Sequence, residues 1–420
     1  MSRVDARLSP PPAPAVPYTV AIRGAFAVTF LLRSSQMGTI AIIVPYLLDR
    51  GVELAMLGTI MVCSAFGAAA ANLITGRLVD RLGAWRALVA GCAVAFLGAI
   101  AFVLISFLPA MAAAYLLTTG GMSAAGNALR TTIGLGTLAT EHERIFGRFN
   151  SVGTAGALVG PILVGLVVID GTAAAPWFAV AALGSAGVVS LLSRRPAVPV
   201  ELRKSTDNPE NADKTDEPGV DGHAADAAAK TSSLDVIRAI GPVVALVSAT
   251  ATMYGVYAVL WGPYLRELGA ADPIIPWSFT ATMLPVVLLS PHAAKVLPNT
   301  PRWLVVGVTT ALLGCLAFAY AMTTSIWLAI VISVVEGVLM AISVPLTYAL
   351  ITKLAPPAAL GRSFGMASAS DAVSSGIGTS IAGVLIAAGG VAFVFQLAGA
   401  YCVLGTALAM LWWWRKSIRR

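Results

Sequence analysis

Hydrophobic and polar residues are distributed along this chain in long blocks. Apolar runs of about 19 to 29 residues alternate with short segments containing charged residues, proline or glycine, and as a helix each run can cross a hydrocarbon core of about 30 Å. The pattern therefore predicts an all-α membrane protein with twelve transmembrane helices. The runs lie near residues 20–48, 54–75, 86–108, 110–138, 150–169, 174–193, 236–262, 274–292, 302–322, 325–351, 366–388 and 391–414.

One long polar stretch interrupts this pattern between the sixth and seventh runs. Residues 194–234 are charged and poor in large apolar side chains, which predicts a disordered cytosolic linker. Residues 1–19 lack the apolar core and cleavage site of a signal peptide, so we expect a disordered cytosolic tail. The chain then divides into two six-helix bundles, at residues 20–193 and 235–420.

Composition supports membrane insertion, and the placement of charge predicts the topology. Only 11% of the 420 residues are charged, against about a quarter in a typical soluble protein. Of the 27 Lys and Arg residues, 23 lie in the tail, the linker, the C-terminal segment and the alternate loops on the same side. We therefore expect both termini in the cytoplasm. The chain has 21 Arg but only 6 Lys, which indicates a GC-rich genome, so we expect a bacterial plasma membrane.

The two halves of the chain repeat one another. "VPYLLDRG" at 44–51 matches "GPYLRELG" at 262–269, and "RIFG" at 144–147 matches "RSFG" at 362–365. The loops after the second and eighth runs end on Trp85 and Trp303. All three pairs are separated by the same distance along the chain, here called the repeat offset. A constant offset predicts a duplicated six-helix unit in parallel orientation.

The loop between the second and third runs reads "GRLVDRLGAWRAL", residues 76–88. It resembles the signature of the major facilitator superfamily, with matches that include Gly76, Asp80, Arg81 and Gly83. The two glycines are expected to allow a tight turn, and the two charged residues to pair or to cap neighbouring helix ends. The resemblance implies a twelve-helix transporter in which these residues belong to a conformational gate.

The fifth run carries a second pattern, "GRFNSVGTAGALVGPILVG", residues 147–165. It is similar to a signature of the drug-antiporter branch of that superfamily, through Gly147, Gly156, Gly160 and Pro161. The resemblance implies export, with the last three residues acting in the conformational gate. The alternative is ordinary packing, because small residues four apart let helices approach closely and proline bends a helix.

By the same resemblance, the first, fourth, seventh and tenth runs line a central cavity. Each of these runs carries polar or aromatic residues at helical spacing, whereas most of the others do not. We expect eight of these residues to contact a substrate. They are Arg33, Gln36, Asn127, Arg130, Tyr254, Tyr257, Trp261 and Met340.

Charged residues inside the apolar runs are the strongest functional candidates, since a charge at mid-bilayer costs roughly 2.5–3.5 kcal/mol on insertion scales. Arg33 either holds an anionic or carbonyl group of the substrate or forms an ion pair with Glu336. Arg130 either contacts the substrate or extends toward the cytosolic surface. Glu336, the deepest carboxylate, is either the proton-coupling site or the partner in that ion pair. Asp371 lies near the start of the eleventh run, where a helix N-terminus favours it.

Enzyme signatures such as HExxH, GxSxG and the phosphate-binding loop do not occur. We therefore expect a protein that is not an enzyme and that uses no cofactor and no metal. The expected partners are a small-molecule substrate, protons and the lipid bilayer, with no nucleic acid, and the expected state is a monomer.

Three functions are open at this point. The first is a transporter that exports a small organic molecule by proton antiport with alternating access. The second is an organic-anion symporter or facilitator in which Arg33 is the anion anchor. The third is a membrane receptor or lipid-moving protein.

Overall fold

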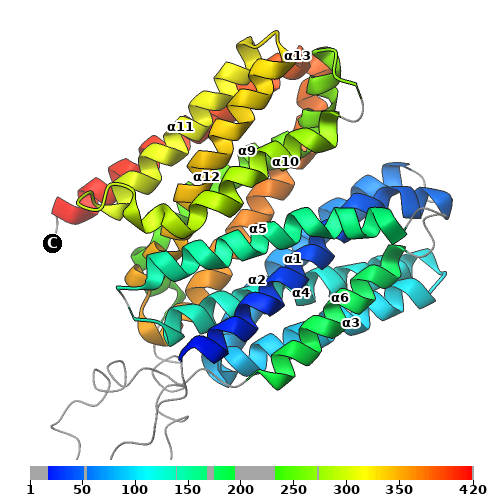
Figure 1. Ribbon diagram of the computed structural model, residues 1–420. Coiled ribbons are helices and arrows are strands. Elements are labelled where there is room, and N and C mark those ends of the chain that lie inside the picture. Colours follow the sequence, from blue (N-terminus) through cyan, green and yellow to red (C-terminus); the bar gives the residue numbers. More distant parts are fainter. Residues whose placement is uncertain are drawn as a thin grey trace, which may run out of the picture.

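The computed structural model describes residues 18–51, 54–138, 140–167, 175–193, 232–271 and 274–418, and all regular secondary structure in these ranges is helical. The predicted fold class is thus confirmed. The predicted tail and linker lie outside the described residues except for their last positions, which open the first helix of each bundle. Figure 1 shows the two bundles.

The N-terminal bundle consists of the helices up to Leu192, and each helix overlaps one predicted run. Gly83 makes the tight turn between the second and third helices with a φ of 86°, a conformation that favours glycine. Gly76 does not contribute to that turn, in contrast to the prediction from the sequence, but lies inside a helix. The helices are α1 (Tyr18–Asp49), α2 (Leu54–Leu82), α3 (Ala84–Leu104), α4 (Leu108–Gly136), α5 (His142–Val167) and α6 (Ala175–Leu192).

The C-terminal bundle repeats this arrangement. Its last helix continues across a break at Gly390, whose φ of 75° divides it into two membrane-crossing parts. With that division, the described helices account for all twelve predicted runs. The elements are α9 (Ser233–Glu267), α10 (Ile274–Leu289), η3 (Ser290–Lys295), α11 (Arg302–Met322), α12 (Ile326–Leu354), η4 (Pro357–Ala359) and α13 (Leu360–Ile418).

Apolar side chains cover much of the outer surface of the bundles. Within the described residues, six helices are long and apolar enough to cross a membrane by length and composition alone, namely α3, α9, α11, α12 and the two parts of α13. Trp177, Trp277 and Trp327 are exposed near the starts of α6, α10 and α12. Tryptophans of this kind are enriched where a helix meets the membrane interface.

The two bundles meet through equivalent glycines. A Cβ on Gly147 in α5 would collide with the carbonyl oxygen of Ser290 in η3, and a Cβ on Gly365 in α13 would collide with the carbonyl oxygen of Asn72 in α2. Both glycines and both carbonyls are related by the repeat offset. The contact between bundles is therefore made twice, with the roles of the two halves exchanged.

Polar clasps reinforce this contact. Asp80 of α2 accepts hydrogen bonds from the backbone N–H groups of Gly361 and Arg362, at 2.7 and 3.1 Å, and from the Arg362 side chain at 3.0 Å. The carboxylate thus caps the first turn of α13, where a negative charge is favoured. Glu143 of α5 pairs with Arg302 of α11 at 2.6 Å.

An aromatic cluster closes the space between the bundles at the same end. Phe146 of α5 contacts Tyr348 of α12 and Phe364 of α13, with ring centroids 5.7 and 6.1 Å apart. Phe146 and Phe364 are fully buried. Figure 1 shows the bundles joined at the end where α1 and α13 begin and diverging toward the opposite end. In this conformation the protein is closed on the side of these helix starts.

Candidate substrate site

A polar network joins the bundles next to the aromatic cluster. Arg130 of α4 donates hydrogen bonds to Asn127 at 3.1 Å and to Ser368 of α13 at 3.0 Å, and its guanidinium lies 5.0 Å from the ring centre of Tyr348. Ser368 in turn donates to Asn127 at 2.7 Å, and Asn127 donates to Asn72 of α2 at 2.7 Å. Since Asn127 is fully buried, this network fixes Arg130 in the interior.

The position of Arg130 bears on its two predicted roles. Its side chain reaches toward α12 and α13 instead of extending to the cytosolic surface. Its Nε atom is buried and has no hydrogen-bond partner among the described residues. A guanidinium carries five N–H donors in a fixed fork, so Arg130 retains a donor for a further acceptor.

Arg33 of α1 lies on the same interior surface. It is half-buried and donates a hydrogen bond to Gln36, one turn along the helix, at 2.9 Å. The absence of a side chain at Gly153 of α5 leaves room for it, because a Cβ there would stand 3.5 Å from the Arg33 Cγ. No salt bridge within 4 Å joins Arg33 to Glu336 among the described residues, so the ion pair that the sequence leaves open as an alternative does not form in this conformation.

Asp371 is the charged group for which the sequence interpretation is wrong. The hydropathy pattern puts it near a helix start, but α13 begins at Leu360 and Asp371 lies three turns further on. Its side chain is exposed, although the residue is one turn beyond Ser368 on the face that meets α4. Its carboxylate interacts electrostatically with Arg33 and Arg130. The site between the bundles therefore holds two arginines and one carboxylate.

Glu336 of α12 lies in a separate cluster inside the C-terminal bundle. It is only 4% exposed, and its carboxylate accepts a hydrogen bond from the hydroxyl of Tyr320 at 2.9 Å. The hydroxyls of Tyr254 and Tyr257 are buried without a hydrogen-bond partner among the described residues. No cation lies within 4 Å of this carboxylate in the part of the chain that the structure describes. Glu336 is thus a buried acid held by tyrosine.

The aromatic residues predicted to line the cavity belong to this second cluster. Tyr257 is 8% exposed and Trp261 is 5% exposed, and both pack against Tyr320. The Trp261 indole donates to Ser278 of α10 at 2.7 Å. Met340 is half-buried beside the same core. The structure therefore separates the eight predicted contact residues into an arginine group between the bundles and an aromatic group around Glu336.

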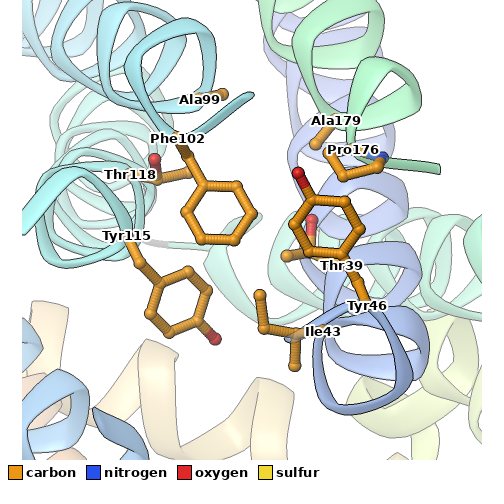
Figure 2. Close-up of a pocket in the computed structure, with 9 residues that line it drawn as sticks. All are labelled: Thr39, Ile43, Tyr46, Ala99, Phe102, Tyr115, Thr118, Pro176 and Ala179. Atoms are coloured by element: carbon orange, nitrogen blue, oxygen red, sulfur yellow. The ribbon is translucent and has the colours of Figure 1, made fainter. Parts of the chain in front are cut away.

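The N-terminal bundle carries an uncharged counterpart of the Glu336 cluster. The repeat offset relates Glu336 to Thr118, Tyr320 to Phe102 and Tyr264 to Tyr46. These counterparts line one cavity of about 20 Å³ among α1, α3, α4 and α6. Figure 2 shows its lining, with the rings of Phe102, Tyr115 and Tyr46 around the space. A cavity of this volume holds about one water molecule, so it is too small to be a substrate site.

Two six-helix bundles related by duplication, made of apolar helices and holding charged side chains between them, are the architecture of a membrane transport protein. The chain belongs to the MFS_1 like family, whose model matches residues 27–397. This places it among the transporters of the major facilitator superfamily. No curated protein sequence matches the chain.

Three solved structures share this fold, each at 13% sequence identity. The human organic anion transporter MFSD10 (TETRAN) has a TM-score of 0.74 and covers 94% of this chain and 100% of its own. The transporter FucP in its outward conformation has a TM-score of 0.68, and the match covers 93% of this chain and 99% of the FucP chain. The proton:xylose symporter XylE bound to 6-bromo-6-deoxy-D-glucose has a TM-score of 0.70, and the match covers 93% of this chain and 94% of the XylE chain. At this identity the similarity concerns the fold.

Proposed function

We propose that this protein is a proton-coupled secondary transporter of small organic anions. The observation that carries the proposal is the charge between the bundles. Arg33 and Arg130 face a single carboxylate, that of Asp371, and form no salt bridge within 4 Å among the described residues. A net positive charge at mid-membrane is costly unless an anion balances it. A carboxylate or similar group on the substrate supplies that balance.

The proton site in this proposal is Glu336. It has one hydrogen-bond donor and no cation beside it among the described residues, so the neutral acid fits the cluster as well as the carboxylate does. The N-terminal bundle packs the equivalent position with Thr118 and Phe102, so the fold itself does not require an acid there. A buried acid that is not required for packing is a candidate for a functional role, here the uptake and release of a proton.

The closed end supplies the geometry for alternating access. With the termini in the cytoplasm, as the charge distribution predicts, the clasps at Asp80 and Glu143 close the cytoplasmic side. Arg33 and Asp371 are then reached from the opposite side. Rocking of the bundles about their glycine contacts exposes the site to each side in turn.

Export by proton antiport is the second candidate function, and it rests on the pattern at 147–165. In the structure a Cβ on Gly160 would collide with the carbonyl of Ser34, and a Cβ on Gly378 would collide with the carbonyl of Thr252. These two contacts are equivalent under the repeat offset. Because the same approach occurs in both bundles, the glycines support close packing more directly than they support a direction of transport.

The test uses purified protein in liposomes with an imposed proton gradient and a pH dye inside. The substrates are benzoate, lactate and succinate as anions, tetraphenylphosphonium as a cation and glucose as a neutral molecule. We expect an anion to be transported with protons. Arg33→Ala should reduce uptake about tenfold or more, the effect of losing a charged hydrogen bond of about 1.5–3 kcal/mol.

Two controls sharpen this result. Arg33→Lys keeps the positive charge and should keep part of the uptake, whereas Arg86→Ala removes an exposed arginine at the start of α3 and should change little. Transport of tetraphenylphosphonium with no response to Arg33→Ala would favour the antiporter over our proposal. Reversing the gradient in the same liposomes reports the direction of coupling.

A further inference from the structure

The two bundles carry opposite charges at the site between them. In the N-terminal bundle, Arg33 stands on α1 beside Gly153 of α5. The equivalent positions in the C-terminal bundle are Ala251 on α9 and Asp371 on α13. The charged residue is thus positive and on the first helix of the pair in one bundle, and negative and on the second helix in the other bundle. Each position has an uncharged residue in the opposite bundle, so the fold itself does not require a charge at either place.

Asp371 is placed to act on both arginines. Ser368, one turn before it, accepts a hydrogen bond from Arg130. The adjacent Ser370 contacts Ser248 of α9, which fixes the rotation of α13 at this level. The Asp371 carboxylate interacts with Arg33 and Arg130 without a salt bridge shorter than 4 Å among the described residues, and its side chain is exposed. Its negative charge offsets part of the charge of the two arginines, and it makes no short salt bridge with them among the described residues that an incoming anion would have to break.

A carrier that alternates between two sides must at some point enclose its site. Enclosing two arginines without a counter-charge is unfavourable, because a charge removed from water needs a partner. A bound organic anion provides one when the carrier is loaded. The empty carrier needs another negative group in order to return.

We propose that Asp371 is that group, a built-in substitute for the substrate anion that lets the empty carrier change sides. This inference rests on the proposed function. The substrate anion displaces Asp371 from the arginines on binding, and Asp371 takes its place again after release. The protein then catalyses net transport and is not confined to exchanging one anion for another.

Removal of this carboxylate should separate two activities that are normally linked. In Asp371→Asn the anion no longer competes with an internal carboxylate, so its KM in exchange should fall. Exchange continues, because both half-cycles are made by the loaded carrier. Net uptake, which needs the empty carrier to return, should fall about tenfold or more. A merely structural defect would reduce both activities together.

The experiment measures net uptake and counterflow of labelled benzoate, with lactate and succinate in parallel, in liposomes containing the purified full chain. Glu267→Gln is the matched control, since it removes an exposed carboxylate at the end of α9. Retained exchange with a lower KM and lost net uptake supports the proposal. Equal loss of both activities, or no change in either, overturns it.

A second variant guards against misfolding of Asp371→Asn. Asp371→Cys, in a background where the exposed Cys63 and Cys315 are serine, can be modified in the folded protein. A methanethiosulfonate bearing a sulfonate restores the negative charge and should restore net uptake, whereas one bearing trimethylammonium should not. Equal effects of the two reagents would overturn the proposal.

The proposed function can fail separately in this experiment. If the wild type transports glucose or tetraphenylphosphonium but none of the three anions, the anion proposal is wrong and the role of Asp371 falls with it. If the wild type transports anions and Asp371→Asn reduces exchange and net uptake equally, only the role of Asp371 is wrong.

Discussion

Arg33, Glu336 and Asp371 each stand where the other bundle has an uncharged residue. Their counterparts are Ala251, Thr118 and Gly153. The duplicated packing contacts are kept at the glycines, while the charges are not duplicated. This difference supports our proposal that the three charged residues act in transport, whereas the glycines serve the packing of the fold.

Only part of this site could be predicted from the sequence. Arg33 and Glu336 are found easily, because a charge interrupts an apolar run. The depth of Asp371 is hidden, because the apolar run begins several residues after the helix does. Ser368 and Tyr320 acquire their roles from partners on other helices, which local spacing does not report. The repeat offset is the signal that could have found Asp371, by showing where the halves differ in charge.

At this scale we predict the effect of Glu336→Gln. The amide keeps the size of the side chain and can accept the hydrogen bond from Tyr320, but it cannot take up a proton. Substrate-driven pH change inside proteoliposomes should be lost, while anion exchange stays within about twofold of the wild type, a difference of about 0.4 kcal/mol. Tyr320→Phe should weaken coupling less. Undiminished proton movement in Glu336→Gln would place the proton site elsewhere.

At the scale of elements, helix number and position follow closely from hydropathy, while helix ends do not. The predicted second run ends at residue 75 and the fifth begins at residue 150, but α2 continues to Leu82 and α5 starts at His142. The added turns are polar and carry Asp80 and Glu143, which contact the other bundle. A search for apolar residues stops before these turns because their side chains are polar, and their contacts with the other bundle are not visible in local sequence.

Close packing between helix pairs leads to a second prediction. Gly378→Ala places a Cβ against the backbone carbonyl of Thr252, and overpacking of this kind costs about 1–3 kcal/mol. Gly383→Ala on the same helix meets nothing within 4 Å and should raise helix stability by about 0.5–1 kcal/mol. The melting temperature of the purified protein in detergent should fall in the first variant and hold or rise in the second.

The equivalent variant in the other bundle completes this test. Gly160→Ala should lower the melting temperature about as much as Gly378→Ala, because its Cβ would meet the carbonyl of Ser34 in the same way. If the glycine pattern acts through packing, uptake and efflux should decline together. Loss of efflux alone would instead support its link to export.

At the scale of the whole molecule, two small polar clasps and an aromatic cluster hold one end closed. The clasps sit on helix ends, and the aromatic cluster belongs to a hydrophobic core that contains residues of both bundles. A balance between two conformations can be shifted by removing a single such contact. Such a balance is what our proposal of alternating access requires.

Asp80→Asn tests this balance. The variant loses the charge that holds the first turn of α13 and the Arg362 side chain, and a hydrogen bond to a charged group is worth about 1.5–3 kcal/mol. Spin labels on Arg77→Cys and Lys353→Cys, exposed positions in opposite bundles, should show a larger share of long distances by pulsed electron resonance. Asp235→Asn, an exposed change at the start of α9, should leave the distribution unaltered.

The paired contacts Gly147 with Ser290 and Gly365 with Asn72 also limit how this gene can change. After a duplication, one copy can usually accumulate substitutions because the other copy still performs the original function. Here each half of the chain supplies the glycine for one contact and the carbonyl for the other. Both halves are therefore needed for the bundles to pack together. Selection must hold both halves to one shape at these points, and only the residues between them can diverge toward a new cargo.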